Sequence, residues 1–242
     1  MRINPFIQFM KQVHGKINPG VYASLQGQSS AQHMAFLRQL QKEVKVEESL
    51  DIPLNELNAV VFDLETTGFF PDKGNEILSI GAVKVKHGKV VDEESFYSLA
   101  KCNTELTPEI KQLTGLKEED FENAQTLSNV LIDFYKFVKG DVLVAHHASH
   151  EKSFLQHFNW KLFRTHFKHR IVDTSFLLKI AEPDSNVIRL EDCCEHCGIP
   201  VKDRHHALGD AKMTAELWCQ CVDKIQEQGC KTLRDVYEKL SK

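Results

Sequence analysis

The sequence lacks the features that mark secreted, membrane-spanning or fibrous proteins. No signal peptide is visible, because the apolar run near residue 6 is short and is broken by Gln8. No apolar stretch approaches the length of a transmembrane helix, and no repeat or low-complexity segment stands out. The seven cysteines are an odd number in a chain of 242 residues, which argues against a disulfide framework. We therefore expect a cytoplasmic protein with reduced thiols and no membrane association.

An excess of positive charge is also missing. The net charge of −4 argues against a bulk electrostatic grip on long duplex nucleic acid. It leaves room for an enzyme that holds a few nucleotides, where clustered carboxylates lower the net charge and bound cations restore it locally. The local exception is a basic run made of Lys161, Arg164, Lys168 and Arg170, with His166 and His169 between them. Such a run could guide a phosphate backbone, although most charge runs are solvated faces.

The composition that is present fits a globular protein in three parts. Hydrophobic residues make up 42% and charged residues 26% of the chain, as in soluble globular domains. Residues 1–57 contain two helical patterns, and charges with Pro53 mark a junction before the pattern changes at Asn58. We therefore predict an N-terminal helical extension of unknown role over residues 1–57, a main domain over 58–228 and a C-terminal helix over 229–242.

The main domain is predicted to be of the α/β class. An apolar run over residues 59–62 is typical of a buried strand, and β-rich segments at 76–86 and 90–99 flank a hairpin turn. Helical patterns, one of them over about residues 149–158, then alternate with short strands at 141–145 and 171–173. This order predicts a mixed sheet with helices on its faces, and sheets of this kind place chemistry in the loops at their strand ends.

Two carboxylates follow the first buried strand. Asp63 and Glu65 are two residues apart, and alternate residues of a strand point to the same face. Two like charges about 4 Å apart repel by about 4 kcal/mol at an effective dielectric near 20, so the pair needs a cation or a proton. An arbitrary Asp-x-Glu is usually two solvated acids. Here the apolar strand before it and the turn Thr66-Thr67-Gly68 after it favour a site, where glycine lets the backbone approach a ligand.

Several motifs together resemble those of one known family. Residues 62–68, Phe-Asp-Leu-Glu-Thr-Thr-Gly, resemble the first motif of the DEDDh 3′–5′ exonucleases, the group that contains the epsilon proofreading subunit of bacterial DNA polymerase III. Residues 145–148 with 154–155 resemble the second motif, and residues 205–211 resemble the third. The resemblance extends over about residues 58–226. It implies an RNase H-like sheet of five strands, three antiparallel and then parallel strands, flanked by helices.

The resemblance implies four metal-binding carboxylates and a histidine base. Asp63, Glu65 and Asp210 stand at three acid positions of the family, and His205 stands at the position of the general base. The third acid position holds Glu151, where the family usually has Asp, so the carboxylate reaches one methylene further. The implied cofactor is a pair of Mg²⁺ or Mn²⁺ ions. Taken alone, His205 could be a polar loop residue, and Asp210 could complement a helix dipole.

The resemblance also implies contacts with the substrate. The predicted substrate-binding residues are Thr66, Thr67, Phe69 and His146. Phe69 could stack on the terminal base, although ordinary packing explains an aromatic residue there equally well. The second motif departs from the family at His147, where Asn is preferred, and at His150, where Phe is frequent.

These features predict a metal-dependent 3′–5′ exonuclease that releases nucleoside 5′-monophosphates, with single-stranded DNA as the expected substrate. Two alternatives stay open. One is an enzyme of the same chemistry that trims 3′ ends of RNA or oligonucleotides, and the other is a non-catalytic nucleic-acid-binding module. The expected partner is a nucleic acid 3′ end, and residues 1–57 could dock on a polymerase or another replication or repair protein.

Overall fold

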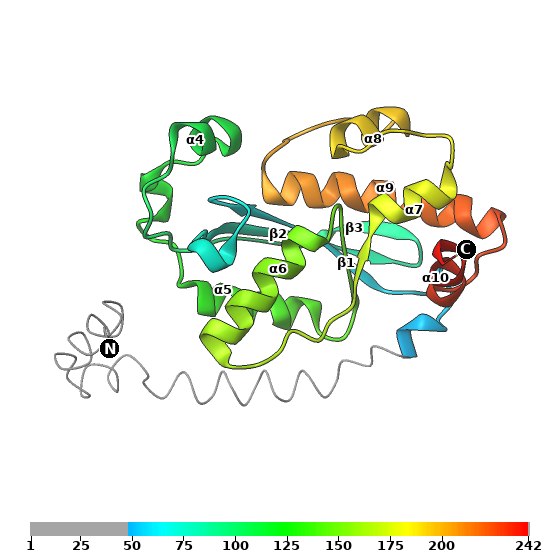
Figure 1. Ribbon diagram of the computed structural model, residues 1–242, viewed down its shortest axis with the longest axis horizontal. Coiled ribbons are helices and arrows are strands. Elements are labelled where there is room, and N and C mark those ends of the chain that lie inside the picture. The colour runs from blue at the N-terminus through cyan, green and yellow to red at the C-terminus, as the bar shows by residue number, and fades with distance from the viewer. Residues whose placement is uncertain (1–47, 242) are drawn as a thin grey trace, which may run out of the picture. The chain divides into compact units, whose positions relative to one another are not determined.

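The computed structural model describes residues 48–241, which form one mixed sheet with helices on both faces (Figure 1). The helices predicted within residues 1–47 lie outside the described residues. The strands are β1 (Ala59–Thr66), β2 (Ile77–Lys86), β3 (Lys89–Leu99), β4 (Val142–Ala145) and β5 (Ile171–Asp173). The larger helices are α4 (Pro108–Thr114), α5 (Leu127–Val138), α6 (Ser149–Phe158), α7 (Thr174–Ala181), α8 (Leu190–His196), α9 (Ala207–Glu227) and α10 (Leu233–Leu240). Shorter turns are η1 (Glu48–Leu50), η2 (Pro71–Lys73), η3 (Glu118–Phe121) and the π-helical η4 (Asn159–Phe163).

The sheet has the order β3-β2-β1-β4-β5. Strand β2 is antiparallel to both β1 and β3, whereas β4 is parallel to β1 and β5 is parallel to β4. Helix α9 packs along β1, β2 and β3 on one face, and α5 lies on the other (Figure 1). The predicted five-stranded mixed sheet flanked by helices is therefore confirmed. Among the described helices, none combines the length and apolarity that crossing a bilayer requires.

In strand β1, the side chains of successive residues face opposite sides of the sheet. Val61 belongs to the core that includes residues of α9, whereas Phe62 faces α5, with its ring centroid 5.4 Å from that of Phe134. Asp63 and Glu65 continue the series of Val61, because side chains two apart lie on the same face of a strand. The two carboxylates therefore emerge on the α9 side of the sheet.

A glycine in β2 lets the first turn of α9 approach this acidic end of β1. Gly81 is the register partner of Asp63. A Cβ atom on Gly81 would lie 2.1 Å from Leu208 N and 2.2 Å from Ala207 C, so any other residue would push the helix away. The close packing brings Asp210, in the first turn of α9, next to β1.

The segment before β1 packs against the C-terminal helix. Leu54 is buried, and its backbone N–H donates to Lys231 O at 2.9 Å. Asp51 and Arg234 form an ion pair at 2.6 Å. Residues 48–57, predicted as the end of the extension, and helix α10, predicted as a separate part, thus both pack onto the main domain.

Candidate active site

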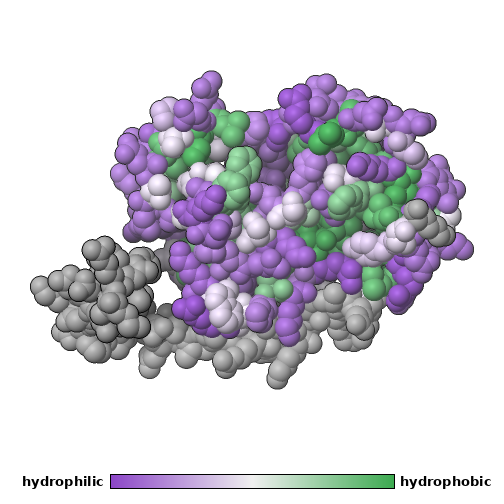
Figure 2. Space-filling view, in the orientation of Figure 1, coloured by the Kyte–Doolittle hydropathy of each residue, from purple (hydrophilic) through white to green (hydrophobic). Residues whose placement is uncertain are grey.

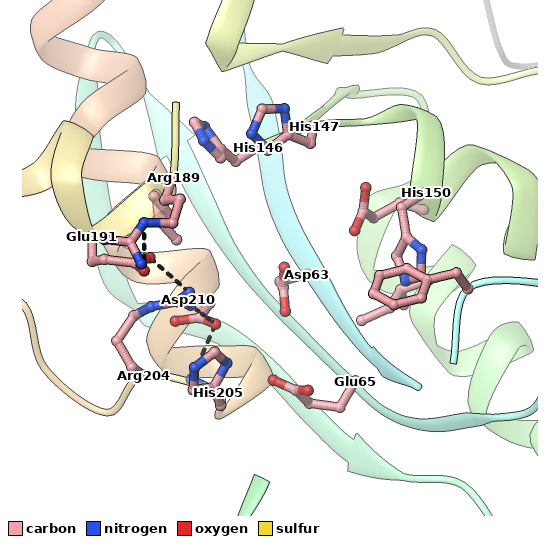
Figure 3. Close-up of a pocket in the computed structure, with 14 residues that line it drawn as sticks. Asp63, Glu65, His146, His147, His150, Arg189, Glu191, Arg204, His205 and Asp210 are labelled. Atoms are coloured by element: carbon pink, nitrogen blue, oxygen red, sulfur yellow. Dashed lines mark hydrogen bonds and ion pairs between the residues drawn. The ribbon is translucent and has the colours of Figure 1, made fainter. Parts of the chain in front are cut away.

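A cleft of about 520 Å³ opens beside the carboxyl ends of β1 and β4 and the first turn of α9 (Figure 3). Its wall includes all five residues predicted to be catalytic, which are Asp63, Glu65, Glu151, His205 and Asp210. They come from four separate parts of the chain: β1, α6, the turn before α9 and α9 itself. The fold therefore assembles the predicted set at one place.

Three of the acids form a tight group at the floor of the cleft. Carboxylate oxygens of Asp63, Glu65 and Asp210 lie within 4.8 Å of one another. Burial, followed by the charges of neighbouring carboxylates, raises the pKa of Asp63 well above its usual value. Burial and the charge of Asp210 raise the pKa of Glu65 to about 8. The group therefore concentrates negative charge that a bound cation would relieve.

Glu151 occupies the opposite wall, in the first turn of α6. Its side chain is buried, and its Oε2 has no hydrogen-bond partner among the described residues. Burial is the main cause that raises the pKa of Glu151 to about 8, and the charges of Asp173 and Glu65 add to it. A buried carboxylate oxygen without a partner carries a desolvation cost, so this oxygen is suited to an ionic ligand.

Asp210 is held on one oxygen and open on the other. Its Oδ2 accepts a hydrogen bond from Arg204 Nη1 and a second, at 3.2 Å, from the backbone N–H of His205. Arg204 also donates from Nη2 to Glu191 Oε2 at 2.9 Å. Oδ1 of Asp210 is buried and has no partner among the described residues. The contacts with Arg204 and His205 therefore fix the carboxylate and leave Oδ1 available to a ligand.

His205 sits in a tight turn with left-handed backbone. Its φ is +61°, and that of Asp203 is +49°. A Cβ on Gly209 would lie 2.3 Å from Asp203 O, so glycine lets the turn fold back on α9. Side chains in such backbone regions are uncommon and are concentrated at functional sites. The next residue, His206, caps α9 and stacks on Tyr97 at 4.5 Å, which anchors the turn beside β3.

His146 lines the cleft with both ring nitrogens engaged. Nδ1 lies 2.8 Å from Thr174 Oγ1, and Nε2 lies 2.9 Å from Ile188 O. Burial lowers the pKa of His146, which favours the neutral ring. His147 contacts the same Ile188 carbonyl at 2.9 Å. The two histidines therefore tie the segment before α8 to the edge of the cleft.

The predicted contacts after β1 divide into two groups. Phe69 lines the cleft, is 76% exposed and meets His150 edge-on with ring centroids 5.7 Å apart. Thr66 Oγ1 donates at 2.8 Å to the carbonyl two residues later, and Thr67 Oγ1 accepts from Glu76 N at 2.9 Å. Neither threonine is among the residues that line the cleft. The threonine side chains hold together the loop that carries Phe69.

Three charged residues of the cleft escaped the sequence reasoning: Arg189, Glu191 and Arg204. A signal for Arg204 was present, because it directly precedes His205 and a set of buried acids needs a compensating cation. Arg189 and Glu191 lie in a segment that matches none of the three family motifs. Their place beside Asp210 results from the packing of α8 on α9.

The donor set fits a hard divalent cation. Within residues 48–241, the group at Asp63, Glu65 and Asp210 offers only carboxylate oxygens, and the unpartnered oxygens of Glu151 and Asp210 face no competing donor. Oxygen ligands of this kind suit Mg²⁺ and Mn²⁺.

The chain is similar to known exonucleases over most of its length. The family model RNase_T, described as "Exonuclease", matches residues 60–218, which is more than half of the chain. A DNA polymerase III PolC-type protein of Caldanaerobacter subterraneus subsp. tengcongensis is 35% identical over 177 residues, covering 73% of this chain and 12% of that protein. A DNA polymerase III subunit epsilon-like protein of Rhodobacter capsulatus is 32% identical over 194 residues, covering 79% of this chain and 27% of that protein. The chain thus spans a minor part of the length of these curated relatives.

A solved structure shares the fold. The nuclease domain of 3′hExo, a DEDDh family member bound to rAMP, gives a TM-score of 0.61 at 20% identity and covers 73% of this chain and 95% of that one.

Proposed function

The chain belongs to the exonuclease family, and from this premise we propose that it is an exonuclease of the DEDDh type, which hydrolyses the terminal phosphodiester at the 3′ end of nucleic acid. The products are nucleoside 5′-monophosphates, and single-stranded DNA is the expected substrate. The observation that carries the proposal is the convergence of four carboxylates and His205 on one cleft, where Figure 3 labels Asp63, Glu65, Asp210 and His205. These side chains come from segments about 150 residues apart in sequence, and no structural need of the fold explains burying so many acids together.

The four acids would hold two divalent cations, Mg²⁺ or Mn²⁺. Asp63, Glu65 and Asp210 supply the close group of oxygens, and Glu151 supplies a further buried oxygen from the opposite wall. When bound, such ions lower the pKa of a coordinated water and stabilise negative charge on the leaving 3′ oxygen. The acids of the protein contribute charge and position, and the unpartnered oxygens support this assignment.

His205 is proposed as the general base. Imidazole accepts and releases protons close to neutral pH, which suits it to take the proton of the attacking water. The left-handed turn fixes the backbone of His205 at the rim of the cleft, where its N–H donates to Asp210. The proton passes from water to the ring, and the strand left behind ends in a new 3′ hydroxyl.

The exposed ring of Phe69 is the proposed seat of the terminal base. Stacking of a base on an aromatic side chain is worth about 1–3 kcal/mol and tolerates any base. His150 supports the ring from the side, and His146 lies further along the cleft. Thr66 and Thr67 enter the proposal through the loop that they hold, whose backbone lies next to the acids.

Digestion of end-labelled strands tests the proposal. A 5′-labelled 20-nucleotide DNA strand should shorten stepwise with Mg²⁺ or Mn²⁺ and stay intact in EDTA, and the released nucleotides should carry 5′ phosphates. The same assay on RNA separates the substrates: degradation of RNA alone would favour the alternative exoribonuclease. The bound rAMP of the structural relative gives that alternative support, whereas the DNA polymerase relatives favour DNA. If neither polymer is cut with either metal, the non-catalytic binding module is the better interpretation.

A replication partner is a further part of the proposal. The named relatives are DNA polymerase III proteins or subunits, and this chain matches only a part of each. Affinity capture from a lysate with the full chain and with residues 48–242 alone compares the two directly. The shorter form keeps the segment that packs on α10. Equal capture of a polymerase by both forms would exclude residues 1–47 as the docking segment.

A further inference from the structure

The basic run seen in the sequence continues helix α6 away from the cleft. From residue 152 to residue 172 the chain has no Asp or Glu, although the whole protein carries a net charge of −4. The cations of this segment are Lys152, Lys161, Arg164, Lys168 and Arg170. The segment is therefore positively charged within a protein of negative net charge, and its first residue directly follows Glu151.

Four exposed side chains of this segment form a stripe. Lys152, Gln156, Trp160 and Arg164 are all exposed and follow one another at intervals of four residues. Residues four apart lie on the same face of a helix, so Lys152, Gln156 and Trp160 run along α6 into η4, and Arg164 follows at the left-handed residue that ends η4. At 1.5 Å per residue, Trp160 lies about 13 Å along the axis from Glu151. The surface over α6 is predominantly hydrophilic (Figures 1 and 2).

Buried neighbours fix the far end of the stripe. Asn159 is 3% exposed, and its Nδ2 donates to Tyr135 Oη and to Leu155 O, the latter at 2.7 Å. Asn159 and Phe163 are both buried, whereas Trp160, which lies between them in the sequence, is 51% exposed. Trp160 therefore offers part of its ring to a ligand in solvent.

Trp160 stands among aromatic and cationic groups. His166 stacks on it, with ring centroids 5.4 Å apart and planes at 30°, and the Arg164 guanidinium lies 6.0 Å from its ring. In the described part of the chain, no carboxylate forms an ion pair with Lys161, Arg164 or Lys168. Exposed cations beside a stacked aromatic pair are the features that bind a single-stranded nucleic acid, through its phosphates and its bases.

We propose that this stripe binds the single-stranded segment that lies 5′ of the nucleotide held in the cleft. A base stacks on the pair of Trp160 and His166, and the phosphates contact Lys152, Lys161 and Arg164. An acidic protein would satisfy the cations but not the exposed aromatic pair, so nucleic acid is the occupant that fits both. The identity of the ligand rests on the proposed function. At 3.4 Å per nucleotide of a stacked strand, about four nucleotides separate the two sites.

Tryptophan fluorescence in EDTA tests the stripe without turnover. The chain has two tryptophans, and Trp218 is 2% exposed, so an external quencher reports Trp160. A 12-nucleotide oligo(dT) should quench the emission, whereas a dinucleotide should not reach it. Binding of a labelled 12-mer, followed by anisotropy, should weaken about 5- to 100-fold in Trp160→Ala and stay close to wild type in Trp160→Phe. The triple variant K152A/K161A/R164A should reduce the slope of log K against log salt by about 2.

Matched variants separate the stripe from general surface effects. Phe176→Ala removes an aromatic side chain that is also 51% exposed, and K101A/K179A/K239A removes three exposed cations elsewhere. Both should bind the 12-mer as wild type does. On a dinucleotide with Mg²⁺, the Trp160 and triple variants should keep the wild-type kcat, because the short substrate does not reach the stripe.

The outcomes distinguish the stripe from the nuclease itself. If the wild type degrades the 12-mer with Mg²⁺ but Trp160→Ala binds it as tightly, the stripe proposal is overturned and the proposed function stands. If the wild type neither binds nor cuts the 12-mer, both are overturned. Loss of binding in the matched controls to the same degree as in the stripe variants would also refute a specific site.

Discussion

The two walls of the cleft hold their acids in different ways. On the α9 wall, Asp210 receives hydrogen bonds from Arg204 and from the backbone of His205, so one oxygen is fixed by the protein. On the α6 wall, Glu151 has a buried oxygen with no partner among the described residues. Among the described residues, each acid keeps one buried oxygen without a partner, but Asp210 is also paired with a cationic side chain and Glu151 is not. We therefore expect the acids of this one site to respond differently to mutation.

The largest effect is expected from removing the charge of Asp210 on the α9 wall. Asp210→Asn removes an anionic ligand and leaves Arg204, which is paired with it, without that partner. We expect kcat on a labelled strand to fall by at least about 10³-fold, since metal-assisted charge stabilisation is worth several kcal/mol. Asp133→Asn, at an exposed pair with Lys136, is the control and should keep wild-type kcat. A kcat within tenfold of wild type in Asp210→Asn would remove this acid from the mechanism.

The next effect isolates how the α9 wall is held. Arg204→Gln frees Oδ2 of Asp210, and groups that orient a metal ligand typically contribute about 10- to 100-fold in metal affinity or activity. The change should appear as a higher Mg²⁺ concentration for half-maximal rate, with most of kcat recovered at saturating metal. Arg204→Lys should recover part of the loss. Arg234→Gln, which breaks an exposed ion pair on α10, serves as control. An unchanged metal requirement in Arg204→Gln would show that Asp210 needs no such support.

A smaller effect is expected on the α6 wall from a change of length alone. Glu151→Asp withdraws the carboxylate by one methylene but breaks no hydrogen bond of Oε2, because that oxygen has none. Since the charge is kept, kcat should change by less than about tenfold, with the metal requirement shifted. Glu151→Gln, which keeps the length and removes the charge, should be more damaging. Equal activity of the two variants would show that Glu151 is not a metal ligand.

The pattern of β1 shows how much of the site could be predicted from sequence. The two-residue period places Asp63 and Glu65 on one face, and the apolar residues before them identify that face as buried. The bounds predicted for the helix that carries Glu151, about residues 149–158, are those of α6. These features depend on local periodicity and on motifs, which a single sequence contains in full.

Other features depend on contacts that sequence patterns do not encode. Thr66 and Thr67 stand in the first motif, but their hydroxyls contact Gly68 O, Glu76 N and His150 Nε2, which are partners that the sequence pattern alone does not identify. The segment around Pro53 has the composition of a junction. It is instead joined to residues near 231, almost 180 positions away, through backbone hydrogen bonding. Local composition carries no information about a partner so distant in the chain.

The smallest expected effect is on the thermal stability of the protein, and it distinguishes the metal-free cleft from the cleft with a bound ion. The pKa of Glu65 is raised from 4.5 to about 8, so between these values the folded protein binds a proton that the unfolded chain has released. Stability of the metal-free protein is therefore greatest below about pH 4.5 as far as this group is concerned, and it falls as the pH rises towards 8. Glu65→Gln cannot ionise, so the substitution removes this pH-dependent loss of stability.

In EDTA at pH 7.5, Glu65→Gln should therefore melt at a higher temperature than wild type. A release of about 1–3 kcal/mol corresponds to roughly 3–10 °C for a domain of this size. At pH 5 the two proteins should melt within a few degrees of each other, because wild-type Glu65 is then protonated. Saturating Mg²⁺ should stabilise the wild type more than the variant, because the ion compensates the same charge. If Glu65→Gln instead melts below wild type in EDTA at pH 7.5, groups of the protein already compensate the charge of the Glu65 carboxylate. The argument that this carboxylate needs a bound cation would then fail.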